Sequence, residues 1–424
     1  MPRDLVRPLE DAWQDIIDAV LRRRGAPGTR EVAKLTPGLV ELSQAYNAGL
    51  TGDGARVRVP LDARIAFSFA RDVPKGAGAV RDLVRAGALT IRPDHTLRIV
   101  DVGAGLGAMT WGIVRALTRA APEGPVRVEA LLVDEDAEAL KAAELIAREA
   151  AAQLGPDAHP GLSIRTRTER IAVGMKLPEA DVVVVGQVLS ELDVGMDPAA
   201  RAEKHAALIA DLLERVVAPD GALVVVEPAL RDRTRHLHAV RDLLAVRGAT
   251  IFGPCLHASG CPMLTTMGDW CHEDLPVDLP SWVAPLARAA GLRWQGLTFS
   301  HLVLRRDSRR LVDELRPAPS HVHLRVVSDL IRTKGKAEVF GCTSGGERLR
   351  IRRLDRDASS SGPGAAATAT WERLGRGDVL TVSAGEEGPE HAEQGSEQAS
   401  KAPPIDERGR VSVTAHIDVW PIRK

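Results

Sequence analysis

Three of the four cysteines in this 424-residue chain fall close together, an arrangement that suits metal binding. Cys255, Cys261 and Cys271 lie in the stretch CLHASGCPMLTTMGDWCH, and Cys342 follows much later. Their spacings do not match the paired C-x-x-C motifs of common zinc sites. An iron–sulfur cluster tolerates such spacing, because its thiolates can come from distant loops. The residues alone leave iron–sulfur, zinc and four unrelated buried thiols open.

A glycine-rich turn follows the apolar run LRIVDV. It contains Gly103, Gly105 and Gly107. Glycines let the backbone turn tightly and approach a ligand, while the next helix points its free N–H groups at that ligand. The pattern also fits the dinucleotide form G-x-G-x-x-A, so a nicotinamide or flavin cofactor, or an empty pocket, stays open. Asp134 after the next strand can accept hydrogen bonds from both ribose hydroxyls of either cofactor, and Asp101 before the glycines favours S-adenosylmethionine.

The residues after the fourth predicted strand bear on the chemistry. Methyltransferases that act on exocyclic nitrogens of bases usually carry Asn or Asp-Pro-Pro-aromatic there, whereas this chain reads GQVLSEL, with Gln187 expected near the cofactor. No cysteine follows the fourth or fifth strand, so covalent attack on a pyrimidine has no evident nucleophile. Glu191 and Glu227 stand near carboxyl ends of strands, where ligands bind in open α/β sheets. Either could instead cap a helix or form an ion pair, so catalytic residues stay unassigned.

These residues need a scaffold, and from 93 to 312 apolar runs alternate with helical runs. The continuous runs LRIVDVG, VEALLVD, ADVVVVG and ALVVVEP are typical of parallel strands covered on both faces. Helical runs long enough for crossover connections separate them. The succession predicts a doubly wound α/β domain, with the Cys-rich stretch at 254–272 as an insertion.

Both ends of the chain differ from this pattern. Residues 1–92 carry apolar side chains at helical spacing and predict an N-terminal helical region. Residues 313–424 read as short strands, which predicts a small β-barrel-like domain, because closure removes exposed edges. Within it, 384–409 is rich in Glu, Gln, Gly and Ser, and we expect a disordered loop.

Composition places limits on the class of protein. The hydrophobic share of 44%, charged share of 27% and net charge of -1 fit a soluble globular protein and exclude a globally basic nucleic-acid coat. No stretch is apolar for the length of a membrane span, and the N-terminus does not resemble a secretory signal. We therefore expect a cytoplasmic protein without a membrane partner, in which disulfides are not favoured.

Taken together, the motifs resemble the methyltransferase-like small-ribosomal-subunit assembly proteins, a family best known from mitochondria and with bacterial relatives. The resemblance runs from the N-terminal helices to the last strands. It rests on D-V-G-A-G-L-G followed by Thr110 and Trp111, on V-L-S-E-L, on Glu227-Pro228, on P-C-L-H-A-S-G-C-P with D-W-C-H, and on F-S-H-L-V-L. The chain departs from the family at Leu256, Ala229 and His301, where Pro, Gly and Tyr are usual.

The resemblance implies a class I S-adenosylmethionine-dependent methyltransferase (Rossmann-like) fold, with the cofactor near the glycine turn, Asp101, Asp134 and Gln187. It also implies a 4Fe-4S cluster on Cys255, Cys261, Cys271 and Cys342, with zinc as the alternative. The implied partners are small-subunit ribosomal RNA and the assembling small ribosomal subunit. We expect the protein to bind them as a monomer. Whether such proteins methylate RNA is not settled by the motifs. A noncatalytic RNA-binding assembly factor and a small-molecule methyltransferase remain alternatives.

Two basic runs are candidates for RNA contact, and solvated surface faces are the alternative. They are Arg305, Arg306, Arg309 and Arg310, and Arg348, Arg350, Arg352 and Arg353. Arg350 and Arg352 would share one strand face, which suits contacts along a phosphate backbone. Tryptophan is scarce and tyrosine almost absent, so a broad aromatic platform for base stacking is not expected.

Overall fold

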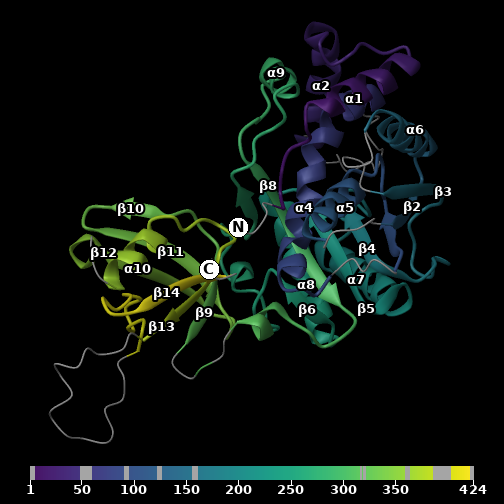
Figure 1. The fold of residues 1–424 in the computed structure, drawn as a ribbon. Coiled ribbons are helices and arrows are strands. Elements are labelled where there is room, and N and C mark those ends of the chain that lie inside the picture. Colours follow the sequence, from purple (N-terminus) through teal and green to yellow (C-terminus); the bar gives the residue numbers. More distant parts are fainter. Residues whose placement is uncertain are drawn as a thin grey trace, which may run out of the picture.

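A computed structural model of the chain describes most of its residues (Figure 1). The described residues are 5–47, 60–89, 95–121, 127–154, 161–315, 318, 321–358, 363–384 and 403–420. None of the described helices is long and apolar enough to cross a membrane.

The centre of the molecule is a mixed eight-stranded sheet in the order β3-β2-β1-β4-β5-β8-β6, with β7 paired to β8. β1, β2, β3, β4 and β5 pair in parallel, whereas β8 runs antiparallel to β5, β6 and β7. Strand order reverses between β1 and β4, and ligands bind outside the carboxyl ends of strands at such a switch point. The strands are β1 Leu97–Val102, β2 Val128–Asp134, β3 Leu162–Thr168, β4 Ala180–Gly186, β5 Val217–Glu227, β6 Thr250–Gly253, β7 Glu273–Leu275 and β8 Leu297–Arg305.

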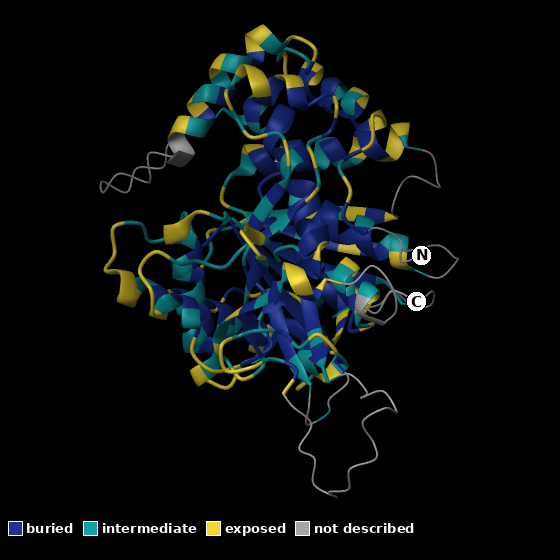
Figure 2. Cartoon of the chain, turned by 90° about the vertical axis from the view of Figure 1, so that its left-hand side faces the viewer, coloured by how far each residue is buried: buried dark blue, intermediate teal, exposed yellow. Residues whose placement is uncertain are grey.

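Helices cover both faces of this sheet, and buried residues concentrate between the layers (Figure 2). One face packs against α4 Phe69–Arg85, α5 Ala108–Ala120 and α6 Ala137–Gln153. The other packs against α7 Pro198–Arg215 and α8 Arg231–Val246. The remaining helices before β9 are α1 Ala12–Arg23, α2 Val32–Asn47, α3 Leu61–Ala63, the π-helical η1 Arg64–Ser68, the 3-10 turns η2 Pro262–Leu264 and η3 Leu311–Glu314, and α9 Ala284–Ala289.

Helices α4 and α5 approach each other to backbone contact. A Cβ added at Gly76 of α4 would lie 2.3 Å from the Met109 carbonyl oxygen, and one at Gly112 of α5 would lie 1.9 Å from that of Val73. Only glycine fits at either position. Because α5 begins at the glycine turn, this contact fixes the position of α4 beside the ligand-binding end of the sheet.

The C-terminal part is a curled antiparallel sheet that forms a half-barrel, with a short helix packed against it. Its order is β10-β11-β9-β13-β14, with β12 paired to β11. The elements are β9 Val322–Val326, β10 Ile331–Thr333, β11 Lys336–Thr343, β12 Arg348–Leu354, the 3-10 turn η4 Asp355–Asp357, α10 Pro363–Trp371, β13 Val379–Ser383 and β14 His416–Trp420. Trp371 of α10 is buried in the core of this sheet.

A buried ion network joins the half-barrel to the α/β domain. Arg325 of β9 donates from Nη1 to Asp82 of α4 at 2.7 Å and from Nη2 to Glu273 of β7. Arg81 also donates to Glu273, at 3.3 Å. Burial opposes ionisation, but the arginines hold the pKa of both Asp82 and Glu273 below their ordinary values. Three segments far apart in sequence therefore share one set of compensating charges.

The expected fold class is confirmed: a class I methyltransferase-type α/β domain follows N-terminal helices and precedes a half-barrel. The expected division at 92 lies outside the described residues, the one at 312 falls within η3, and both stay predictions. Among the elements that were not expected are the edge strand β3 and helix α10. Of the expected disordered loop at 384–409, residues 385–402 lie outside the described residues, and Ile405 forms a β-bridge with Val411.

We predict that Arg325→Leu lowers the free energy of unfolding by about 3–5 kcal/mol, because it removes an arginine partner from two buried carboxylates, those of Asp82 and Glu273. Urea denaturation of the full chain would measure the change. The matched control is Arg332→Leu, which removes an exposed pair with Glu372 and should cost less than about 1 kcal/mol. Equal effects of the two substitutions would contradict a stabilising role for the buried network.

Candidate functional site

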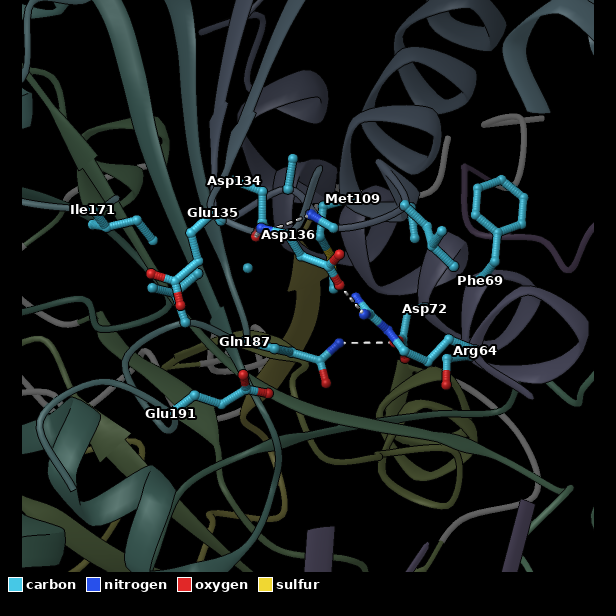
Figure 3. Close-up of a pocket in the computed structure, with 18 of the residues that line it drawn as sticks. Arg64, Phe69, Asp72, Met109, Asp134, Glu135, Asp136, Ile171, Gln187 and Glu191 are labelled. Atoms are coloured by element: carbon cyan, nitrogen blue, oxygen red, sulfur yellow. Dashed lines mark hydrogen bonds and ion pairs between the residues drawn. The ribbon is translucent and has the colours of Figure 1, made fainter. Parts of the chain in front are cut away.

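The glycine turn forms one wall of a cavity of about 650 Å³ at the switch point (Figure 3). Gly103, Gly105 and Gly107 have φ values of 76°, 51° and 75°, in the left-handed region that favours glycine. A Cβ at Gly103 would lie 2.2 Å from Val188 Cγ2, so this glycine also keeps space open beside the fourth strand. Gly103 and Gly105 line the cavity, whereas Gly107 lies behind it, against Leu132.

The end of β2 supplies an acidic wall. The Asp134 carboxylate accepts hydrogen bonds from the backbone N–H groups of Gly105 and Asp136, both at 2.8 Å. Asp136 caps α6 and pairs with Arg64 of η1 at 3.0 Å. Asp134 is thus fixed at the cavity edge with its orientation set by the backbone.

The opposite wall is built around Gln187, directly after β4. Gln187 has a positive φ of 59°, and its Nε2 donates to Asp72 of α4 at 2.9 Å. Asp72 also accepts from Lys75 at 2.7 Å. Although burial opposes its charge, the cations Lys75 and Arg71 hold the pKa of Asp72 at about 2. The ionised carboxylate only accepts hydrogen bonds, and this fixes which end of the Gln187 amide faces it.

Asp101 lies beneath the turn and does not line the cavity. Its Oδ2 accepts a hydrogen bond from Thr110 Oγ1 at 2.7 Å, and its Oδ1 is buried without a partner among the described residues. Burial raises the pKa of Asp101 to about 7, and the nearby Asp134 adds to this effect. Asp101 is therefore placed to support the turn from below.

Of the two glutamates near the strand ends, Glu191 lines the cavity and Glu227 does not. Glu227 is buried and accepts hydrogen bonds from the backbone N–H groups of Leu189 and Ser190, at 2.8 and 3.2 Å. Burial raises its pKa to about 7. These contacts favour the alternative in which Glu227 holds the turn after β4.

The four cysteines line one small cavity between α8, the insertion and the half-barrel. Cys255 follows β6, Cys261 and Cys271 lie on either side of η2, and Cys342 is in β11. Burial raises the pKa of Cys261 and of Cys342 to about 12, and the nearby Cys255 adds to both shifts. Among the described residues, no group of three or more His, Cys, Asp or Glu side chains is arranged to hold a metal ion.

Helix α8 positions the cysteine loops, a role that could not be predicted from its own residues. Arg235 donates to the carbonyl oxygens of Met263, Thr266, Asp269 and Leu264, at 2.8 to 3.2 Å. Arg241 donates to the carbonyl oxygens of His257 and Ser259. Asp242 accepts from the Cys261 backbone N–H at 2.9 Å. One helix thus organises the loops that carry three cysteines.

The two basic runs predicted to contact RNA differ in their structural surroundings. The first run is structural: Arg305 is buried and donates to Ala88, Asp220 and Asp307, and Arg309 donates to the carbonyl oxygens of Ala86 and Gly87. The prediction that Arg305 contacts RNA is therefore wrong, because its guanidinium donors are already bonded to other residues of the protein.

The second run lies within β12. Arg348, Arg350 and Arg352 face Cys342, Phe340 and Glu338 across the strand pair, whereas Arg353 is buried. Arg348 lies 4.3 Å and Arg350 5.8 Å from the centre of the Phe340 ring. The predicted sharing of one strand face by Arg350 and Arg352 is confirmed by this register.

The strand order and glycine turn define a class I S-adenosylmethionine-dependent methyltransferase fold. Within that class, the chain belongs to the family described as mitochondrial small ribosomal subunit Rsm22, whose model matches residues 66–371. The family assignment made from the motifs is thereby confirmed. No curated protein matches the chain.

Solved structures similar to this chain include three methyltransferases. A S-adenosylmethionine-dependent methyltransferase from Clostridium acetobutylicum is 14% identical, with a TM-score of 0.23 over 36% of this chain and 49% of that chain. An O-methyltransferase from Thermotoga maritima is 14% identical, with a TM-score of 0.30 over 59% and 73%. An N-methyltransferase from Bradyrhizobium japonicum is 13% identical, with a TM-score of 0.30 over 62% and 98%.

We predict that the buried carboxyl of Asp101 makes folding pH-dependent. Because its folded pKa of about 7 exceeds its ordinary value, its stabilising contribution is full below about pH 4 and is lost as pH rises through 7. Asp101→Asn should remove this slope, which reaches at most about 1.4 kcal/mol per pH unit. Urea denaturation between pH 4 and 8 measures it. The exposed Asp15→Asn is the control, and parallel curves for Asp101→Asn and wild type would refute the prediction.

Proposed function

We propose that this protein is a S-adenosylmethionine-binding, ribosomal RNA methyltransferase-like protein that acts in assembly of the small ribosomal subunit. The observation that carries the proposal is the cavity at the switch point between β1 and β4. Family membership supports the small subunit as the setting, with ribosomal RNA as the substrate or partner. We place the protein in the cytoplasm, as the sequence predicts.

The charge of the cavity suits this cofactor. Five of its six ionisable lining side chains are acidic. They are Asp72, Asp134, Glu135, Asp136 and Glu191, with Arg64 as the cation. S-adenosylmethionine carries a sulfonium and an ammonium against one carboxylate, so an acidic wall attracts it. When bound, it supplies an electrophilic methyl group.

The residues of this chain would divide the binding task. Gly103 and Gly105 leave room for close approach of the ligand, and the Asp134 carboxylate would accept hydrogen bonds from the ribose hydroxyls. Arg64, held by Asp136, would face the carboxylate of the cofactor. Gln187 would close the cavity on the side of the acceptor. No described side chain is required as a base if the acceptor is an amine that loses its proton to solvent.

A 4Fe-4S cluster on Cys255, Cys261, Cys271 and Cys342 forms the second part of the proposal. Each thiolate of such a cluster binds a different iron, so the sulfurs need not converge on one point as they do around zinc. Cavity residues also carry buried polar atoms without partners among the described residues, including His238 Nδ1, Arg241 Nε and His272 Nδ1. Since buried polar groups are normally satisfied, these atoms fit a ligand-filled cavity. A bound cluster supplies cross-links between the insertion and the half-barrel.

Cofactor binding is tested with the glycine turn. Gly103→Ala should weaken binding of S-adenosylhomocysteine at least about tenfold in calorimetry, because its methyl group collides with Val188. Gly248→Ala is the control, since Gly248 also has a positive φ, of 85°, but nothing within 4 Å of an added Cβ. An unchanged affinity in Gly103→Ala, or no binding by wild type, would contradict the assignment of the cofactor to this cavity.

Methyl transfer is tested with the same two variants. Wild type and Gly248→Ala should transfer labelled methyl groups to small-subunit RNA, and Gly103→Ala should do so at least about tenfold more slowly at subsaturating S-adenosylmethionine. Binding of the cofactor without any transfer to RNA or assembling subunits would favour the noncatalytic assembly factor.

The cluster is tested through stability, because metal-binding energy is folding energy in such sites. Cys342→Ser should lose visible absorption and unfold at lower temperature than Ala337→Ser, which places the same hydroxyl at a buried position of β11 outside the cavity. Thermal unfolding followed by circular dichroism and absorption measures both. Matching curves for the two variants would argue against a cross-linking cluster.

A further inference from the structure

A second cavity, of about 300 Å³, adjoins the first, and Gln187 lines both. It lies between α2, α4, the start of α8 and the residues that lead into β8. Its apolar lining includes Phe67 and Leu230, and Leu230 is 44% exposed although it is a large apolar residue.

The charge of this second cavity is opposite to that of the first. Every ionisable side chain that lines it is a cation, namely Arg71, Lys75, Arg233 and Arg293. Lys75 is buried and paired with Asp72, whereas the Arg293 side chain is 56% exposed and paired with Asp274. Cationic groups therefore line the cavity from the interior to the surface. A cavity with apolar walls and several cations suits a planar ring that carries an anionic group.

Gln187 gives the boundary between the cavities a defined polarity. Its amide nitrogen donates to Asp72, which is ionised and can only accept (Figure 3). The other end of the amide, Oε1, has no partner among the described residues. Because Gln187 lines both cavities, this fixed acceptor belongs to the boundary between them. Such an acceptor favours a ligand with an N–H donor over one with a carbonyl at the same position, because the carbonyl would leave it unsatisfied.

We infer that the second cavity binds one nucleotide of an RNA whose base carries an exocyclic amino group, with Gln187 Oε1 accepting from that amine and Arg233 and Arg293 facing the phosphate. The inference rests on the proposed function, and it adds a substrate class. It also gives Gln187 the acceptor role that an Asn or Asp has in the usual base-amine motif, which this chain lacks. The apolar walls accommodate the base, and the cations select a phosphate-bearing ligand.

The test compares two pairs of nucleotides that differ only in an amino or oxo group. Equilibrium dialysis of the full chain would use CMP against UMP, and AMP against IMP, with and without saturating S-adenosylhomocysteine. We expect the amino member of at least one pair to bind at least about fivefold more tightly. Gln187→Leu should abolish that preference, and Arg233→Ala should weaken both members of the pair equally, at least about threefold. The control Arg247→Ala, at the other end of α8 and paired with Glu203, should change neither.

Equal binding of the amino and oxo members in both pairs would overturn the inference, as would nucleotide binding that Arg233→Ala leaves unchanged. Neither result touches the proposed function, which is judged by S-adenosylhomocysteine binding in the first cavity. Failure to bind S-adenosylhomocysteine, with the nucleotide preference intact, would instead overturn the cofactor assignment alone.

Discussion

The backbone contact between α4 and α5 is the constraint on which the sites of this protein depend. Glycines at 76 and 112 let the helices touch, so α4 lies directly beside the turn that starts α5. The first half of α4 then supplies Asp72 and Lys75 to the cavities, and its second half supplies Asp82 to the buried network with Arg325. A single helix thus connects the ligand-binding end of the sheet to the junction with the half-barrel. Buried charges on a helix are costly unless paired. Asp72 pairs with Arg71 and Lys75 of α4 itself, whereas Asp82 pairs both with Arg81 of α4 and with Arg325 of β9.

The two cavities on either side of Gln187 are lined by side chains of opposite charge, and this difference distinguishes the proposed cofactor site from the proposed acceptor site. The acidic cavity suits a cationic methyl donor, and the basic cavity suits a phosphate-bearing acceptor. Because Asp72 holds Lys75, Arg71 and Gln187 together, the same carboxylate separates the two regions and orients the amide between them. In the proposed function, specificity then follows from one fixed acceptor and from the surrounding charge.

Parts of this arrangement could be predicted from sequence, and others could not. The apolar runs of β1, β2, β4 and β5 are recognisable because both faces of these strands are buried, and the glycine turn marks the first cavity. β3 escapes prediction, because it is an edge strand whose side chains are mostly part-exposed. The charges of α4 look like surface residues, since their partners Glu273 and Arg325 come from distant strands. Likewise, nothing local to Arg235 or Arg241 indicates that they hold the cysteine loops.

The cysteine cavity is where the α/β domain, its insertion and the half-barrel meet, and the proposed cross-link between them depends on what fills it. The direct measurement is the iron, acid-labile sulfide and zinc content of full-length protein purified without oxygen, together with its visible absorption spectrum. We expect about four irons and four sulfides per chain, as one cubane cluster on four thiolates requires, with broad visible absorption. Stoichiometric zinc without sulfide, or no metal at all, would contradict this expectation.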